Sequence, residues 1–263
     1  MIVSFESERW ILRPFNGVFF TVFALFLLLL IGASLLLRGK SERTRVNVLT
    51  GACLVTLVGF FVYKYRLSFD MEYRVANAAM GGFNWWGELP LNLCNINMIL
   101  IPIAVRRNSR PLKSFCFFAG ALGALMALMM PSAGFSGYSI LMPRMVGFFF
   151  THFMVFIEAL AIVTFGLYRP TFRDMPMTLV ATLLISIAVF GISMLLRVTG
   201  LFDKANYFFS VETEGNPVLE LFHSWLPYPY LYLLPCYLVL CPYMALITLG
   251  FYLADRAKNK TTV

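Results

Sequence analysis

The chain has 263 residues, of which 60% are hydrophobic and only 13% are charged. A soluble surface needs roughly twice that charge, so the composition excludes an ordinary soluble protein. The formal net charge of +8 raises the possibility of nucleic-acid binding. However, Lys and Arg gather in short clusters between apolar runs, and this pattern indicates membrane topology, with no nucleic-acid partner.

Seven apolar runs approach the length of about 20 residues that a membrane-spanning helix needs. We therefore predict an all-α fold, a polytopic transmembrane helix bundle of about seven spans, with residues 1–263 as one domain. The predicted spans lie near residues 15–37, 46–65, 89–105, 112–130, 143–168, 177–199 and 228–253. Their connections leave no room for a separate soluble domain.

The segments outside and between these spans carry their own signals. Residues 66–86 mix charged and aromatic side chains and contain Gly81-Gly82, which predicts a surface-lying segment followed by a turn. In the fourth span, Gly120 and Gly123 have the small-residue spacing that allows close packing, and we expect contact with the third span. Residues 200–224 form the longest non-apolar stretch, and long loops of this kind tend to be functional.

The orientation follows from the basic clusters. Residues 38–45, residues 106–113 and the tail after residue 255 are rich in Lys and Arg, and seven spans place all three on one side. Under the positive-inside rule that side is cytoplasmic. We therefore predict a multi-pass protein of the cell membrane with its N-terminus outside and its C-terminus in the cytoplasm.

This topology brings a thiol and an imidazole to similar depth. Cys94 follows the interfacial pair Trp85-Trp86 and lies just below the outer end of the third span. His152 lies about nine residues, or roughly 13 Å, below the outer end of the fifth span. A thiol in apolar surroundings is inert unless a neighbouring base takes its proton, and His152 is the only histidine within a predicted span. Such a pair could attack an ester carbonyl and hold the acyl group as a thioester.

Other polar residues on the same face could support this chemistry. An amide donor must stabilise the oxyanion, and Asn206 or Asn92 could serve. Arg144 and Arg197 could each bind a phosphate, because guanidinium pairs with phosphate oxygens in a bidentate manner. The chain has two histidines and no CxxC pair, so we predict no metal site and no cofactor.

Each of these residues also has a simpler interpretation. Cys94 could be a small buried hydrophobe, and His152 could hydrogen-bond within the bundle. Arg144 and Arg197 could be interfacial anchors that reach to headgroups. Glu158 lies about 240° around the helix from His152, so we expect it to make a buried polar contact with another helix, outside the pocket.

Four phrases of the sequence resemble the YwaF family of bacterial membrane proteins in their order and approximate spacing. They are Leu89-Pro90-Leu91-Asn92-Leu93-Cys94, Pro143-Arg144 followed by Phe148-Phe149-Phe150-Thr151-His152, Asn206-Tyr207, and Pro227-Tyr228-Pro229-Tyr230. That family looks related to the animal transmembrane acyltransferase that moves polyunsaturated acyl chains onto ether lysophospholipids. The resemblance implies that Cys94 is the nucleophile and that His152 is its partner. Asn206 and Tyr207 lie in the polar stretch on the same face, and we expect them to stabilise the oxyanion or to position groups at this site.

We therefore predict a membrane acyltransferase or transacylase that moves a fatty acyl chain between phospholipids or lysophospholipids through a thioester on Cys94. The alternative is a non-catalytic membrane protein that binds or transports lipid through the same cavity. Transport would be favoured by Gly- and Pro-interrupted spans at matched positions of two halves, and the sequence has no such pairing.

Overall fold

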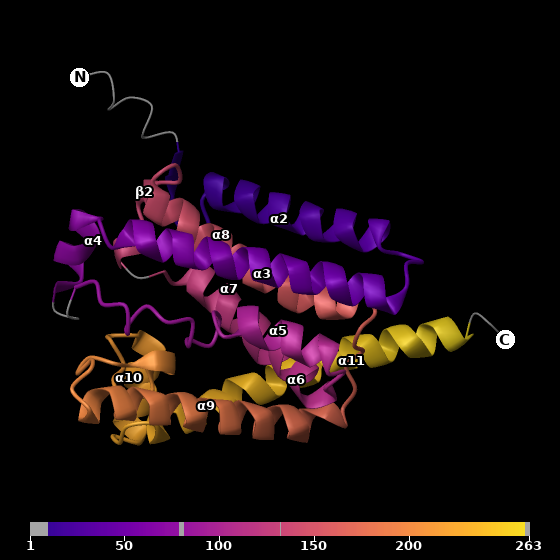
Figure 1. Cartoon of the computed structure of the whole chain (residues 1–263). Helices are drawn as coiled ribbons and strands as arrows, with labels where there is room; N and C mark the ends of the chain where they lie inside the picture. Colours follow the sequence, from indigo (N-terminus) through magenta and orange to yellow (C-terminus); the bar gives the residue numbers. More distant parts are fainter. Residues whose placement is uncertain (1–9, 79–81, 132, 261–263) are drawn as a thin grey trace.

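The computed structural model describes residues 10–78, 82–131 and 133–260, and they form a bundle of helices (Figure 1). Six segments are long and apolar enough to cross a membrane. They are Gly17–Leu36 (α2), Glu42–Leu67 (α3), Arg110–Met129 (α6 to α7), Pro143–Thr164 (α8), Asp174–Val198 (α9) and Leu231–Lys258 (η6 and most of α11). Together with the shorter apolar helix Asn97–Arg106 (α5), they confirm the predicted helical bundle of about seven spans.

Local sequence explains where the first helices begin. The side-chain oxygen of Asn16 accepts a hydrogen bond from the Phe19 N–H at 2.9 Å and caps α2. Ser41 caps α3 in the same way, accepting from the Thr44 N–H at 3.2 Å. Such caps satisfy N–H groups that have no partner inside the helix. Both helices therefore start within a few residues of the predicted spans.

The long helices pack in two groups with shorter ones between them. In Figure 1, α2, α3 and α8 lie along one side of the bundle and α9 and α11 along the other, with α5, α6 and α7 between. Helix α8 contacts α2, α3 and α7, whereas α6 contacts α9. Because α8 also contacts α5 and so touches at least four of the described helices, the residues along it can meet side chains from distant parts of the chain.

Helices α3 and α8 run antiparallel at close range. A Cβ atom at Gly147 would lie 2.2 Å from the ring of Tyr63, so only glycine allows this approach. Further along, the Thr56 hydroxyl donates to Glu158 Oε1 at 2.6 Å. This bond confirms the predicted contact between Glu158 and another helix. The end of α3 therefore lies beside the start of α8.

Hydrogen bonds tie the basic clusters together at one end of the bundle. Arg45 donates to the Phe165 carbonyl, and Lys113 donates to the Leu167 carbonyl at 2.8 Å. Arg110 and Arg169 form ion pairs with Asp174 and Asp255. These contacts join the start of α3, α6 and α9 to the ends of α8 and α11. The basic residues of three separate loops thus share one end, as the sequence predicts.

The third predicted span is helical only in its second half. We expected a helix from residue 89, but α5 begins at Asn97, and residues 89–96 form consecutive turns. Pro90 lacks an N–H group and favours a turn. The Asn92 side chain bonds outside the segment, to the Phe208 N–H at 3.1 Å. Cys94 therefore lies on an irregular segment and is not on a helix.

The fourth span contains a π-helical segment, Cys116–Gly120 (η3), between α6 (Arg110–Phe115) and α7 (Ala121–Met129). A Cβ atom at Gly120 would lie 2.0 Å from Asn97 Nδ2, and one at Gly123 would lie 2.9 Å from Leu93 Cγ. The expected close contact between the third and fourth spans is therefore confirmed. π-helical segments within α-helices are frequently found at functional sites.

Short elements gather at the end opposite the basic clusters, where α4, α10 and β2 appear in Figure 1. They are β1 (Ile11–Leu12), α4 (Met71–Ala76), η4 (Ala133–Phe135), β2 (Tyr138–Ser139), η5 (Tyr207–Phe209) and α10 (Pro217–Trp225). Strands β1 and β2 pair antiparallel. The polar stretch 200–224 thus includes most of α10. Of the segments considered in the sequence, Met1 and Gly81 lie outside the described residues.

Candidate functional site

Cys94 and His152 meet inside the bundle, although 58 residues separate them in the sequence. Cys94 Sγ lies 3.4 Å from His152 Nε2, within hydrogen-bonding distance for sulfur. Both side chains are buried, with exposed fractions of 8% and 7%. Cys94 comes from the turns before α5, and His152 comes from the middle of α8.

The other nitrogen of the imidazole defines its tautomer. His152 Nδ1 lies 2.7 Å from the Phe148 carbonyl oxygen. A carbonyl can only accept, so Nδ1 carries the proton and donates it. Nε2 of the neutral ring is then an acceptor that faces the thiol. The Phe148 ring also packs on the imidazole, with 4.2 Å between centroids, and holds its orientation.

The turn that carries Cys94 is braced from α5. Asn97 is fully buried, and its Nδ2 donates to the Leu93 carbonyl at 3.1 Å. The backbone N–H groups of Cys94 and Asn95 lie beside the Cys94 sulfur. Within the described part of the chain, neither of these two N–H groups donates to a backbone carbonyl. A continuous helix would have used both, so the early end of regular structure leaves two donors beside the thiol.

A cavity of about 600 Å³ opens beside this pair. Much of its wall is apolar, with side chains from several helices, such as Phe60, Leu93, Leu122, Met126, Phe148 and Leu240. Four buried polar atoms on the same wall have no hydrogen-bond partner among the residues that the structure describes: Tyr63 Oη, Asn95 Oδ1, Thr151 Oγ1 and Tyr207 Oη. Buried polar groups are normally paired, so these atoms point to a ligand or water with polar groups of its own. The mixture of apolar wall and convergent polar groups suits an amphiphile.

A charged cluster lines the same cavity near the end of α3. Lys64 forms an ion pair with Glu88, and the Tyr73 hydroxyl donates to the other Glu88 oxygen at 2.8 Å. The side chains of Lys64 and Glu88 are each only 11% exposed. Burial raises the pKa of the Tyr73 hydroxyl, and the Glu88 carboxylate beside it acts in the same direction. Tyr73 therefore remains a protonated donor at neutral pH.

The two asparagines proposed for the oxyanion differ in their surroundings. Asn206 Nδ2 donates to the Glu212 carbonyl and to Glu214, while its oxygen accepts the N–H groups of residues 211 and 212. It lines the cavity, but its hydrogen-bonding groups are used to fold its own loop. Asn92 also lines the cavity; its side-chain oxygen accepts the Phe208 N–H, and its amide nitrogen has no acceptor among the described residues. Its amide nitrogen is thus the better placed donor.

Tyr207 lies on the cavity wall and is buried, and its hydroxyl has no partner within the described ranges. Burial raises the pKa of this hydroxyl, so it is a protonated donor. The next two residues, Phe208 and Phe209, have φ angles of 60° and 53°, a region that non-glycine residues adopt at a cost. The side chains of residues 205 and 207 pack with Leu89 and Leu91. The loop therefore covers the turns that carry Cys94.

Neither arginine proposed for phosphate binding lines the cavity. Arg144 donates to Asp70 at 3.1 Å and to Glu72 at 2.8 Å, and its side chain is 2% exposed. Arg197 donates to the Ala205 carbonyl at 2.7 Å and to Glu212 at 2.9 Å. Both guanidinium groups thus tie polar segments to the bundle. Phosphate binding by either would require these bonds to break.

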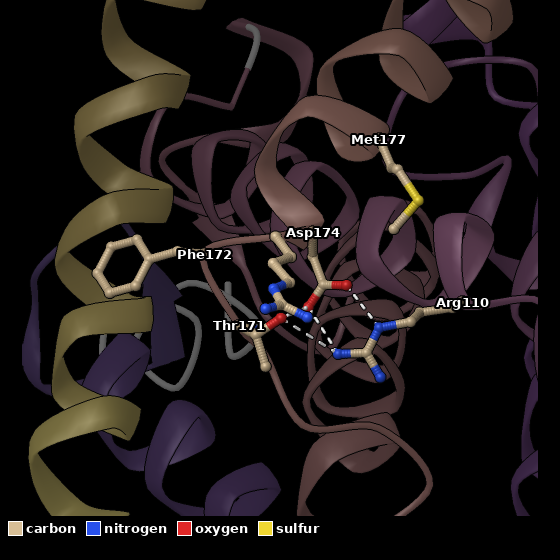
Figure 2. Close-up of a pocket in the computed structure, with 6 residues that line it drawn as sticks. Arg110, Thr171, Phe172, Asp174 and Met177 are labelled. Atoms are coloured by element: carbon tan, nitrogen blue, oxygen red, sulfur yellow. Dashed lines mark hydrogen bonds and ion pairs between the residues drawn. The ribbon is translucent and has the colours of Figure 1, made fainter.

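A second hollow, of about 630 Å³, lies at the basic end of the bundle. Figure 2 shows the Arg110 guanidinium facing the Asp174 carboxylate, with Phe172 turned toward α11. Arg110 also donates to the hydroxyl of Thr171 and to the Arg169 carbonyl. The polar groups that line this hollow are hydrogen-bonded to one another and connect α6 to α9. Its described lining residues include no buried polar side-chain atom without a partner. Across residues 10–78, 82–131 and 133–260, no three potential ligands converge on a metal position.

Sequence reasoning missed several residues that line the cavity, among them Lys64, Glu88 and Asn95. Asn95 directly follows Cys94, and Asn92, Asn95 and Asn97 all lie within three residues of the thiol. This density of asparagines could have indicated a polar site around Cys94. Lys64 lies in the last turn of α3 and reads like an interfacial anchor. Glu88 lies next to the Trp pair, and no spacing in the sequence links it to Lys64.

Comparisons with known proteins give one match. No curated protein and no solved structure matched the chain. A scan of family models matched residues 9–248 to the model described as the TMEM164 family. This match is consistent with the resemblance to an animal transmembrane acyltransferase, while the resemblance to the YwaF family stays a prediction. Because the match covers nearly the whole of a 263-residue helical membrane protein, the chain belongs to the TMEM164 family.

Proposed function

We propose that this protein is a cysteine-dependent acyltransferase or transacylase that moves a fatty acyl chain between phospholipids or lysophospholipids. The observation that carries the proposal is the hydrogen bond from the Cys94 thiol to Nε2 of His152, whose Nδ1–H is held by the Phe148 carbonyl. A nucleophile beside a base that a third group orients is the arrangement of covalent catalysis. Here the orienting group is a backbone carbonyl.

The first half-reaction transfers the acyl group to the protein. The thiol proton moves to His152 Nε2 as Cys94 Sγ attacks the ester carbonyl of a lipid donor, and a tetrahedral oxyanion forms. The oxyanion collapses, the bond to the glycerol oxygen breaks, and His152 returns its proton to that leaving oxygen. The products are a lysolipid and a thioester on Cys94.

The second half-reaction reverses these roles. The hydroxyl of an acceptor lysophospholipid gives its proton to His152 Nε2 and attacks the thioester carbonyl. The C–S bond then breaks, and the thiolate takes the proton from His152. If water replaces the acceptor, the same steps release a fatty acid. The burial of Cys94 and His152 favours transfer over hydrolysis, because it restricts the access of bulk water.

Donors for the oxyanion are available beside the thiol. The backbone N–H groups of Cys94 and Asn95 lie beside the sulfur, and Asn92 lines the same cavity. Preorganised donors of this kind are worth about 10²–10³ in rate for each one removed from a known oxyanion hole. These backbone groups cannot be deleted by side-chain substitution, so Asn92 is the donor to test.

Lipid substrates are supported by the cavity and by its place in the bundle. It lies at the end opposite the basic clusters, where the positive-inside rule predicts the outer face of the cell membrane. Apolar walls can accept an acyl chain, while the unpaired polar atoms can accept a headgroup or glycerol oxygen. We propose the N-terminus outside and the C-terminus in the cytoplasm.

The acyl-enzyme gives a direct test. Purified protein is incubated with a phospholipid donor and measured by intact mass and by peptide mapping. We expect an acyl adduct on Cys94 that disappears when a lysophospholipid acceptor is added, and no adduct in Cys94→Ala. The matched control is Cys241→Ala, which changes a half-buried cysteine that does not line the cavity.

The alternative function, a non-catalytic lipid-binding or transport protein, is favoured by the same cavity. It predicts that phospholipid binds to the parent protein and to Cys94→Ala with equal affinity, with no adduct and no lysolipid product. Acyl transfer by Cys94→Ala at the parental rate would exclude a thioester on Cys94 as the intermediate.

A further inference from the structure

The cluster of Lys64, Glu88 and Tyr73 has no part in the acyl-transfer steps, yet it lines the same cavity as Cys94. A buried ion pair in a membrane protein is costly and commonly marks a functional site. The Lys64 side chain is 11% exposed, and its ammonium group lies 4.8 Å from the Tyr63 ring centroid. This cation therefore lies inside the bundle and does not reach freely to bulk water.

The hydrogen bonds of the cluster engage both oxygens of Glu88 but leave N–H donors of Lys64 without an acceptor among the described residues. One Glu88 oxygen accepts from Lys64 and the other accepts from Tyr73. An ammonium group has three N–H donors. Among the described residues, Glu88 is the single hydrogen-bond acceptor for Lys64. The neighbouring Tyr63 hydroxyl is buried and has no hydrogen-bond partner in the described part of the chain. Lys64 and Tyr63 can thus donate together to an oxyanion.

The position of this pair relative to the thiol is set by α3. Phe60 packs in one cluster with Cys94, and Lys64 follows Phe60 by one helical turn, about 6 Å further along α3. Lys64 also interacts electrostatically with both Cys94 and His152. It lies in the last turn of the helix, toward the end where headgroups are expected. From the expected headgroup region inward, the Lys64 ammonium group therefore comes first and the Cys94 thiol lies deeper.

We propose that Lys64, with Tyr63, forms a subsite for the phosphate of a glycerophospholipid, and that Glu88 holds the ammonium group in place. In such a lipid only a few covalent bonds separate the phosphate from the ester carbonyls. A lipid with its phosphate at Lys64 therefore has an ester within reach of Cys94. The inference rests on the proposed function, because it names the class of lipid whose ester is presented to the thiol.

The test compares lipids that differ only in the phosphate. Full-length protein carrying Cys94→Ala is purified in a phosphate-free detergent, and the affinity for a short-chain diacyl phospholipid is compared with that for the matching diacylglycerol. We expect tighter binding of the phospholipid. In Lys64→Gln/Glu88→Gln, which removes both charges, phospholipid affinity should fall about tenfold or more, the usual loss for a charge-assisted hydrogen bond. Diacylglycerol affinity should be unchanged.

Two further variants separate ligand binding from structure. Glu88→Gln keeps the ammonium group and removes its carboxylate partner, so phospholipid affinity should be retained or increased. Lys113→Gln removes another buried lysine, which does not line the cavity, and should leave the ratio of phospholipid to diacylglycerol affinity unchanged. If Glu88→Gln lowered the ratio of phospholipid to diacylglycerol affinity as much as the double variant does, the assignment of the phosphate to Lys64 would be overturned.

Inorganic phosphate identifies the source of the phosphate. If it displaces the phospholipid from the parent protein but not from the double variant, the subsite accepts phosphate of either origin. If it has no effect while the phospholipid preference persists, the phosphate must be carried by a lipid. An unchanged affinity ratio in the folded double variant would overturn the proposal.

The binding measurement needs no turnover, so the two proposals can fail separately. A preference for phospholipid without an acyl adduct in protein that retains Cys94 would support the phosphate subsite and contradict the acyltransferase function. An adduct on Cys94 without a phosphate preference would do the reverse.

Discussion

Gly120 lies directly against the side-chain amide of Asn97, and a Cβ atom at position 120 would be 2.0 Å from Asn97 Nδ2. That amide also donates to the Leu93 carbonyl at 3.1 Å, one residue before Cys94. The π-helical segment on one side of the interface is therefore connected, through a single buried side chain, to the turn that carries the candidate nucleophile.

Gly120→Ala tests this connection. The added methyl group must displace Asn97, and overpacking of this kind costs about 1–3 kcal/mol. We expect lower thermal stability and a rate of Cys94 acylation reduced by about 10²-fold, the effect of roughly 1 Å of misplacement. Intact-mass kinetics of acylation and a thermal melt provide the measurements.

The control for this variant is Gly191→Ala in α9, where an added Cβ meets nothing within 4 Å. It should leave acylation unchanged and should stabilise slightly, because alanine favours a helix by about 0.8–1 kcal/mol over glycine. Full acylation activity in Gly120→Ala would show that the Cys94 turn does not depend on Asn97.

His152→Gln removes the base while leaving a polar side chain in the bundle. General acid–base catalysis contributes about 10²–10⁴-fold, so acyl transfer should fall by that factor. His223→Gln changes the other histidine of the chain, which does not line the cavity, and should retain the parental rate. Equal rates in the two variants, measured by release of lysolipid, would assign His152 to the fold alone.

Glu158→Gln should preserve activity. Glu158 is 2% exposed, accepts the Thr56 hydroxyl at 2.6 Å, and does not line the cavity. Glutamine has nearly the same shape and can accept the same bond. Glu158→Leu removes this acceptor and leaves the Thr56 hydroxyl with the Ala52 carbonyl at 3.1 Å, at a net cost of about 0.5–1.5 kcal/mol. Both variants are measured for thermal stability and for activity per folded molecule. Abolished transfer in a stable Glu158→Gln protein would instead place this carboxylate in the chemistry.

Arg144→Gln distinguishes a structural ion pair from a headgroup-binding site. Removing Arg144 takes the guanidinium partner from Asp70, which is 22% exposed and still accepts the Tyr73 N–H, and from Glu72, which is 70% exposed. Loss of a charge-assisted hydrogen bond costs about 1.5–3 kcal/mol. We expect a large drop in thermal stability that Asp70→Asn partly suppresses in the double variant. A raised KM for phospholipid with unchanged stability would support the headgroup role predicted from the sequence.

The predicted orientation is tested by reporters fused to the C-terminus. A fluorescent protein that matures only in the cytoplasm should be bright at this position, and alkaline phosphatase should be inactive. The opposite result would place the basic end of the bundle outside, against the positive-inside rule. It would also move the Cys94 cavity to the cytoplasmic face.

The sequence by itself determined the class of fold and nearly all of the helices. In a bilayer every backbone N–H and C=O must be satisfied within the segment, so a sufficiently long apolar run has to be helical wherever the rest of the chain lies. The spans at 15–37 and 143–168 were therefore within reach of local reasoning. So was the pairing of small residues at Gly120 and Gly123 with the third span.

The tertiary structure decided which polar side chains meet. It stopped the third helix at Asn97, placed Nε2 of His152 against the Cys94 thiol, joined Lys64 to Glu88, and engaged Arg144 with Asp70 and Glu72. Hydropathy along the chain records how deep a residue can lie but not toward which neighbour it points. That direction depends on helix packing between residues that are far apart in the sequence, and only the assembled bundle fixes it.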